Sequence, residues 1–346
     1  MITIKDIARE SGYSVGTVSR TLNGREGVSD KARERIMRVV DKYGFVLNSN
    51  AKFLKQRESH GIFVILKGTE NMLFSAITEL LQRKIEDNDY ECSVYYLNEE
   101  ENEVKFADRM ILERKPEGIL FLGSNLEFFR NEFKNRGVPC VLVTNDGSDL
   151  GCENLSSIST DDCTAAEYII DMLISLGHTK IGIVGGDMEY STAAKYRLEG
   201  CMRSFEKHGV PFDVMSQYVR GYFSLESGYS AAGRLFRKMP DITAIFAMSD
   251  VTAIGVMRAA ADRGIRIPED LSLVGFDGID IADFLSPRLT TIRQNREAIA
   301  SRSLDILMGM IKGELEPVHE LVPFSLKQGN SVRDIRTPED EESSMV

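Results

Sequence analysis

The sequence predicts an all-α helix-turn-helix domain at the amino terminus, followed by an α/β body of two doubly wound parallel-sheet subdomains. Three observations predict this. The first 57 residues contain three short helical patterns separated by turns. From Gly61 onward, short apolar runs alternate with amphipathic stretches, as buried parallel strands alternate with their covering helices. The 346 residues are also too many for one compact domain, so a small head and two subdomains are expected.

The amino-terminal helices are predicted from their caps and apolar spacing. Thr3 can cap the first helix with Asp6 as the N3 carboxylate, and Gly12 ends that helix. Ser14 is a good N-cap for a second helix, whose spacing turns Val18 toward the first one. The outer face of the second helix then carries Gly16, Ser19, Arg20 and Asn23. This face is the one free to contact another molecule.

A third helix is expected from about Ser29 to Gly44, and it closes a small core. Residues 1–57 hold 12 Lys and Arg against 6 Asp and Glu, whereas the rest of the chain holds 30 against 47. A basic head on an acidic body indicates that only the head binds a polyanion. The alternative is a helical hairpin docked on the body, but such short helices rarely form an outer layer.

The stretch from Thr3 to Leu54 resembles the DNA-binding headpiece of the lactose repressor (LacI/GalR) family of bacterial transcription regulators. The resemblance rests on S-x-x-T-V-S-R-x-L-N from Ser14 to Asn23 and on the spacing of the segments that follow. It implies that Val15 and Gly16 help to choose the operator sequence and that Arg20 reaches a guanine edge. It also implies backbone-phosphate contacts by Thr17, Ser19, Asn23 and Ser29.

Residues 48–56 are predicted to form a hinge helix with Asn48 as its N-cap. The helix is two turns long, so alone it should be disordered. In the family that it resembles, two such helices fold on the operator and wedge a leucine pair into the minor groove. Leu54 matches that leucine, and Ala51 matches the small residue that lets the helices approach. An ordinary linker is the alternative. The residues expected at DNA are Thr3, Ser14, Val15, Gly16, Thr17, Ser19, Arg20, Asn23, Ser29, Asn48, Ala51, Lys52 and Leu54.

The body is predicted to contain two α/β units. Strands are expected at residues 62–66, 93–96, 118–122, 138–143, 180–184, 243–248 and 271–274. Helices are expected at residues 72–87, 165–176, 195–208 and 251–263. Right-handed crossovers put helices on both faces of such sheets, and ligands then bind beyond the carboxyl ends of the strands.

The body, from Gly61 to about Arg333, resembles the effector-binding core of the same family, which has the fold of periplasmic sugar-binding proteins. Matching stretches include TDDCTAAEYIIDMLISLGHTKIGIVGG, YRLEG and VGFDG. The resemblance implies three crossings between the subdomains, near Ser159, Leu289 and His319, and these act as a hinge. The first subdomain would hold residues 61–158 and 291–318, and the second would hold 160–288 and 320–333.

The resemblance also implies an effector cleft between the subdomains. Arg197 would donate to ligand oxygens, Phe223 would stack on the ligand, and Asp277 would accept hydrogen bonds. Leu73 and Phe74 match cleft positions, although both also fit the core of their own helix. The expected effector-binding residues are Leu73, Phe74, Thr144, Arg197, Phe223, Ser249, Asp277 and Gln294. This set suits a sugar, and a purine or another small metabolite would fit it as well.

Signatures of other function classes are missing from the sequence. It has no H-E-x-x-H, G-x-S-x-G, P-loop or G-x-G-x-x-G motif, so neither catalysis nor a cofactor is expected. The five cysteines form no C-x-x-C pair, so no metal site is indicated. No apolar run approaches about 18 residues, so a cytoplasmic protein without a membrane span is expected. A transport-type sugar-binding protein, the main alternative, would carry an export signal instead of a basic head.

Residues 334–346 are acidic and lack leucine heptads, so a disordered tail is predicted rather than a tetramerising coiled coil. A homodimer is expected, because two heads on a two-fold axis match a pseudo-palindromic operator. Effector binding in the cleft would change the angle between the amino-terminal subdomains. That change would control whether the hinge helices fold on DNA, with the effector acting either as an inducer or as a corepressor.

Overall fold

The computed structural model describes residues 4–22, 28–43, 61–68 and 70–336. The chain divides into two compact units, residues 1–58 and 59–346. Several residues predicted to contact DNA lie outside the described part, namely Thr3, Asn23, Asn48, Ala51, Lys52 and Leu54. The predicted hinge helix is therefore not among the described elements.

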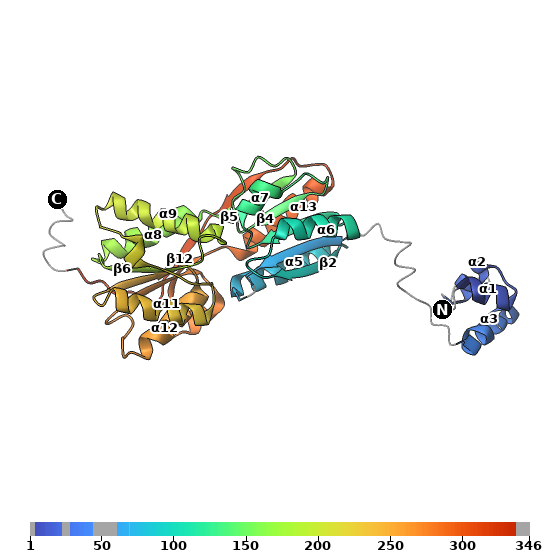
Figure 1. Ribbon diagram of the computed structural model, residues 1–346, viewed down its shortest axis with the longest axis horizontal. Coiled ribbons are helices and arrows are strands. Elements are labelled where there is room, and N and C mark those ends of the chain that lie inside the picture. The colour runs from blue at the N-terminus through green and yellow to red at the C-terminus, as the bar shows by residue number, and fades with distance from the viewer. Residues whose placement is uncertain (1–3, 23–27, 44–60, 69, 337–346) are drawn as a thin grey trace. The chain divides into compact units, whose positions relative to one another are not determined.

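The described residues of the first unit form the three helices predicted for the headpiece core (Figure 1). They are α1 (Ile4–Ser11), α2 (Val15–Leu22) and α3 (Asp30–Tyr43). Ile7 and Val18 are fully buried at the centre of their shared core. Gly12 ends α1 with a φ of 78°, in the left-handed region that favours glycine. The Thr17 N–H donates to Ser14 Oγ at 3.2 Å, which is the cap expected at the start of α2.

The second unit holds two six-stranded sheets, each with helices on both faces (Figure 1). The first sheet has the strand order β11-β5-β4-β3-β1-β2, and its neighbouring strands pair in parallel. Its strands are β1 (Gly61–Lys67), β2 (Glu91–Leu97), β3 (Gly118–Leu122), β4 (Cys140–Val143), β5 (Leu155–Thr160) and β11 (His319–Val322). Helices α5 (Met72–Asp87) and α13 (Arg296–Ile311) bury one face, and α6 (Glu103–Arg114) and α7 (Leu126–Glu132) bury the other.

The second sheet has the order β12-β10-β9-β8-β6-β7, and only β12 among these strands runs antiparallel. Its strands are β6 (Ile181–Gly185), β7 (Tyr218–Arg220), β8 (Ala244–Ala247), β9 (Ser272–Asp277), β10 (Thr290–Arg293) and β12 (Ser325–Lys327). Helices α8 (Asp162–Ser175) and α9 (Thr192–Lys207) cover one face, and α11 (Leu225–Lys238) and α12 (Asp250–Ala261) cover the other (Figure 1). Two short helices, α10 (Val214–Gln217) and η1 (Asp280–Phe284), complete this subdomain.

Two of the three predicted crossings lie later in the chain than expected. The first crossing follows β5, which ends at Thr160, one residue after the position predicted for it, Ser159. The second was predicted near Leu289, but residues 290–293 form β10 and pair with β9, so the crossing falls at residues 294–295. The third was predicted near His319, but residues 319–322 form β11 and pair with β5, so the chain crosses at residues 323–324. Both strands are short and polar, and strand pairing rather than apolar patterning decides where they belong.

The carboxy-terminal segment packs further than predicted. Disorder was expected from Asp334, but the Ile335 N–H donates to the Leu176 carbonyl at 3.0 Å. The buried His178 ring also holds this segment, because its Nε2 lies 3.0 Å from the Arg333 carbonyl oxygen. The rest of the predicted tail, residues 337–346, lies outside the described residues.

Candidate functional sites

The outer face of α2 is open to solvent. Val15 is 42% exposed, and Gly16 and Arg20 are exposed as well, whereas Val18 on the opposite side is buried. A β-carbon at Gly16 would meet nothing closer than Ser14 Oγ at 3.7 Å, so another surface can approach the backbone here. Arg20 Nε makes one long hydrogen bond, 3.4 Å, to the Gly16 carbonyl. The guanidinium can therefore turn outward at little cost.

The other predicted DNA-binding residues in the described part lie along α2 or directly before α2 and α3. Ser14 is exposed at the start of α2, and Thr17 and Ser19 are half-buried along it. Ser29 is exposed directly before α3, and its carbonyl accepts the N–H groups that begin that helix. Ser14 and Ser29 thus stand at the starts of two successive helices.

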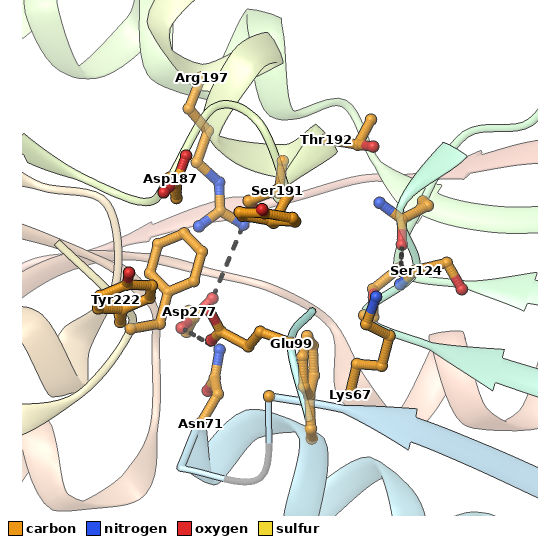
Figure 2. Close-up of a pocket in the computed structure, with 18 of the residues that line it drawn as sticks. Lys67, Asn71, Glu99, Ser124, Asp187, Ser191, Thr192, Arg197, Tyr222 and Asp277 are labelled. Atoms are coloured by element: carbon orange, nitrogen blue, oxygen red, sulfur yellow. Dashed lines mark hydrogen bonds and ion pairs between the residues drawn. The ribbon is translucent and has the colours of Figure 1, made fainter. Parts of the chain in front are cut away.

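A cavity lies between the two subdomains of the second unit, where the carboxyl ends of strands from both sheets converge. Six of the predicted effector residues line it, and they are Phe74, Thr144, Arg197, Phe223, Asp277 and Gln294. Figure 2 shows Arg197 and Asp187 across the cavity from Lys67 and Ser124. The cavity volume is about 60 Å³, whereas small-molecule pockets usually measure roughly 300–1,000 Å³. A ligand the size of a sugar therefore needs the two subdomains to move apart.

Arg197 forms the floor of the cavity on the second subdomain. Its Nε donates to Asp162 Oδ1 at 2.8 Å, and its Nη1 donates to the Met248 carbonyl. The guanidinium also stacks 3.6 Å from the ring centre of Phe276. Its Nη2 lies 3.9 Å from Asp277 Oδ1. The arginine is held rigidly, and the edge that faces Asp277 is the part directed toward the cavity.

Asp277 ends β9 at the centre of the cavity. Its φ of 117° is a strained value for a residue with a β-carbon. Gln294 Nε2 donates to its Oδ1 at 2.8 Å, and Asn71 Nδ2 donates to its Oδ2 at 3.2 Å. Burial raises the pKa of Asp277 to about 6, although Arg197 and the two amides act in the opposite direction. Asp277 thus gathers donors from both subdomains.

A second buried carboxyl, Asp250, lies behind Asp277. Its Oδ2 accepts the Ile279 N–H at 2.8 Å, and its Oδ1 accepts the Thr291 hydroxyl at 2.6 Å. Burial, and then the nearby Asp277 charge, raise its pKa to about 8. Gly275 makes room for it, because a β-carbon there would lie 2.2 Å from Asp250 Oδ1. Asp250 does not line the cavity, so its role is to hold β9 and its following turn in place.

Two predicted effector residues do not line the cavity. Leu73 is buried in the core under the first sheet, because it points inward from the first turn of α5 while Phe74 points toward the cavity. Ser249 is also fully buried and caps α12, where its Oγ accepts the Thr252 N–H at 3.1 Å. Leu73 precedes the cavity-lining Phe74 in the chain but faces the core from α5, and Ser249 is held by its capping hydrogen bond to α12, so neither side chain reaches the cavity.

Several cavity residues were missed by the sequence analysis. Lys67, Glu99, Ser124, Asn145, Asp187, Tyr190 and Tyr222 all line the cavity. Lys67 ends β1, and Ser124 and Asp187 come within two residues of the ends of β3 and β6. A search for polar residues just after each apolar run would have found these three positions. Glu99 and Tyr222 likewise lie two residues beyond the ends of β2 and β7, but β7 itself was not expected from the sequence.

Several contacts between described residues join the subdomains around the cavity. One is the Asn71–Asp277 hydrogen bond. On another part of the rim, the Leu126 N–H donates to Thr192 Oγ1 at 3.1 Å, and Asn125 Nδ2 donates to the Glu189 carbonyl at 3.2 Å. Lys195 Nζ lies 3.7 Å from Glu127 Oε1, which adds an ion pair between the subdomains. The subdomains are therefore bridged by the chain's own side chains on either side of the cavity.

In the described ranges, no three His, Cys, Asp or Glu side chains lie close enough together to hold a metal ion. Burial raises the pKa of the Cys140 and Cys201 thiols, which disfavours the reactive thiolate. Across the helices that the structure describes, none is long and apolar enough to span a membrane.

Both units match known protein families. Residues 3–48 match the lacI family of bacterial regulatory proteins, and residues 170–332 match a periplasmic binding protein-like domain. The HTH-type transcriptional regulator MalR of Clostridium butyricum is 31% identical over 339 residues, covering 95% of this chain and 99% of that protein. The HTH-type transcriptional repressor CytR of Escherichia coli is 31% identical over 319 residues, covering 90% of each.

Solved structures share the fold. The complex of the transcriptional regulator CelR with cellobiose superimposes with a TM-score of 0.70 at 24% identity, covering 96% of this chain and 100% of that one. The Lac repressor dimer bound to operator and the anti-inducer ONPF gives a TM-score of 0.70 at 23% identity, covering 96% and 99%. At these identities the likeness concerns the fold alone, and it extends over nearly the whole chain.

Proposed function

Because the chain belongs to the lacI family of bacterial regulatory proteins, we propose that it is a ligand-responsive, sequence-specific DNA-binding transcription regulator that represses carbohydrate-utilisation genes. The observation that carries the proposal is the pairing of an exposed helix-turn-helix face with a cavity between two bridged subdomains. A regulator needs one site for DNA and another for the signal, and the two units supply one each. The proposal includes a cytoplasmic location and no catalytic role.

The α2 face is the proposed DNA-reading surface. Arg20, exposed in the last turn of α2, suits bidentate bonding to guanine, and the exposed Val15 at the start of the helix suits contact with a thymine methyl group. Gly16 lets the backbone come close to the groove, while Ser14, Thr17, Ser19 and Ser29 can bond to phosphate oxygens. Thr3, Asn23 and the hinge residues Asn48, Ala51, Lys52 and Leu54 complete the proposed set by resemblance.

Arg20→Ala tests this surface. Loss of one bidentate base contact costs about 1–3 kcal/mol, so specific affinity should fall roughly 10- to 100-fold while non-specific affinity changes little. Gel-shift titration would use the duplex that the wild-type protein selects from a random pool, with scrambled duplex as the non-specific probe. Arg83→Ala removes an exposed arginine from α5 and is the matched control. Equal losses on both probes would remove Arg20 from base reading.

The inter-subdomain cavity is the proposed effector site, and a sugar is the proposed effector. Phe74 and Phe223 offer apolar faces, and Arg197, Asp277, Thr144 and Gln294 offer donors and acceptors for hydroxyl groups. A thermal-shift screen of sugars and nucleosides tests the proposal, because a ligand that binds only the folded state raises the unfolding midpoint. A gel shift that responds to the same compound would link the two sites.

A homodimer is part of the proposal, since a two-fold pair of heads suits a palindromic operator. Exposed apolar side chains on the second subdomain support it, with Phe284 85% exposed on η1 and Leu225 46% exposed on α11. Such side chains favour burial against a second copy. Effector binding would then change the spacing of the two amino-terminal subdomains and with it the ability of the hinge segments to meet on DNA.

A further inference from the structure

The charges around the cavity select the kind of ligand that fits. Resting on the proposed effector function, we infer that the cavity binds an uncharged polyhydroxylated ligand and rejects phosphorylated or carboxylated ones, with Glu99 as a main cause of the rejection. Two cationic and three acidic side chains line it, and the cationic ones are Lys67 and Arg197. An anionic ligand could bind favourably only if one of these two cations were free to pair with it.

Lys67 is already paired. Its Nζ lies 3.0 Å from Glu103 Oε2, and both side chains are almost fully buried. Glu103 is fixed in this position, because its Oε1 accepts the Asn125 N–H at 2.7 Å. A ligand phosphate could recruit Lys67 only by leaving a buried carboxylate without its cation, which is strongly unfavourable.

Arg197 is also paired with carboxylates of this chain. The Asp162 carboxylate accepts from its Nε, the Met248 carbonyl accepts from its Nη1, and Asp277 Oδ1 lies 3.9 Å from its Nη2. Arg197 is therefore shared between two buried carboxylates. A ligand hydroxyl can accept from its remaining N–H groups without disturbing either carboxylate. An anionic ligand group would instead compete with the Asp277 carboxylate for Arg197, and the two negative charges would lie close together.

The carboxylates leave an acidic surplus. Asp187 is buried, and its Oδ2 lies 3.0 Å from Nη1 of Arg220, a residue that does not line the cavity. Glu99 makes no hydrogen bond or ion pair to any residue in the described part of the chain, although Lys67 attracts it from a distance. Burial raises the pKa of Glu99, and the nearby Glu70 and Asp187 charges act in the same direction. Another negative charge at this place would add to an existing repulsion.

The start of α9 does not reverse this balance. Thr192 and Ala193 line the cavity, and a helix amino terminus carries roughly half a positive charge. Ser191 already caps the first turn by accepting the Ala194 N–H at 3.2 Å. The remaining partial charge lies at a cavity that the carboxyl groups of Asp187 and Glu99 also line, so an anion is still disfavoured.

Hydroxyl groups, in contrast, find ready partners. Ser124 Oγ is buried at the cavity wall and has no hydrogen-bond partner in the described chain. A ligand hydroxyl would satisfy it, and the carboxylate of Glu99 can accept from another. The rings of Phe74 and Phe223 supply the apolar faces on which a sugar ring packs. The wall thus suits a ligand rich in hydroxyl groups and without negative charge.

Matched ligands test the inference on the full-length protein. Thermal shift and calorimetry would compare glucose with glucose 6-phosphate and glucuronate, ribose with ribose 5-phosphate, cellobiose with its 6-phosphate, and nucleosides with their monophosphates. Each ligand that binds should be the uncharged member of its set, and its charged counterpart should bind at least 100-fold more weakly. A charged member that binds as tightly as its uncharged counterpart would overturn the inference.

A variant connects the discrimination to Glu99. Glu99→Gln keeps a hydrogen-bonding side chain but removes the charge, so the ratio of uncharged to charged affinity should fall about tenfold. Glu113→Gln, an exposed carboxyl on α6, is the control and should leave the ratio unchanged. An unchanged ratio in Glu99→Gln would remove Glu99 from the selection. If no compound in any set bound or altered DNA binding, the effector assignment itself would fail, which is a separate result from binding of a charged ligand.

Discussion

At the residue scale, buried carboxyls shape the region behind the cavity. Asp250 ties the turn after β9 to β10 through Ile279 and Thr291. Its pKa is raised to about 8 in the fold, whereas an aspartate in an unfolded chain titrates near 3.9. The folded state therefore holds a proton that the unfolded state has lost. The stability associated with this group is complete below about pH 4 and falls as pH rises toward 8.

Asp250→Asn should reduce this pH dependence. The amide cannot ionise, and the Thr291 hydroxyl can accept from it while donating to the Ile292 carbonyl, 3.3 Å away. One such group contributes up to about 1.4 kcal/mol per pH unit between the two pKa values. Urea unfolding from pH 6 to 8 should show a flatter slope in the variant than in wild type. The exposed Asp305→Asn is the control, and identical slopes in all three proteins would refute the assignment.

At the element scale, glycines set the distance between paired helices on the second sheet. A β-carbon on Gly255 of α12 would lie 2.2 Å from the Leu225 carbonyl oxygen, and one on Gly228 of α11 would lie 2.3 Å from that of Thr252. The two helices thus approach through backbone contact. Helix α12 begins with Asp250, so its position also places this carboxyl group behind the cavity.

Gly255→Ala should destabilise the second subdomain. Alanine favours the helix by about 1 kcal/mol over glycine, but the required backbone shift typically costs about 1–3 kcal/mol. A net loss in the free energy of unfolding is expected because the neighbouring atoms are backbone and have no rotamer to change. Chemical denaturation measures it, with Ser230→Ala on the exposed side of α11 as the control. A gain in stability would mean that the helices separate freely.

At the scale of the whole core, the subdomains are bridged around a small cavity. The bridge from Leu126 to Thr192 joins the start of α7 to the start of α9, and the Asn71–Asp277 bond closes another side. Because the free volume is far below that of a sugar-binding pocket, ligand entry requires these bridges to open. The subdomains are joined by three chain crossings, which can act as a hinge and let the subdomains move apart as rigid bodies.

Thr192→Val should loosen the rim without disturbing either sheet. The Leu126 N–H loses its acceptor, and a net hydrogen bond contributes about 1 kcal/mol, or roughly a fivefold change in the opening equilibrium. Hydrogen exchange should accelerate in peptides that cover residues 123–129 and 187–193, while peptides from β3 and β6 keep their protection. Thr179→Val, exposed and outside the rim, serves as the control. Unchanged exchange at residues 123–129 would show that this bridge does not hold the cleft.

Local sequence determined much of the architecture. Gly12 and Ser14 set the turn between α1 and α2 through backbone conformation and capping, which depend on neighbours in the chain. Long apolar runs likewise marked the central strands, including β1 and β3. The strands β5, β7, β10, β11 and β12, which are short or largely polar, were not predicted, because runs such as TTIR and HELV form strands only when a neighbouring strand pairs with them.

The sequence by itself, through its motifs, determined that a helix-turn-helix head precedes a two-subdomain α/β core, and it located Arg197, Asp277 and Phe223 near a cleft. Only the tertiary structure decided that Leu73 and Ser249 face away from the cavity and that Lys67 is paired with Glu103. The reason is physical. Capping and periodicity act over a few residues, whereas the charge and shape of the cavity arise where strand ends from two separate sheets meet.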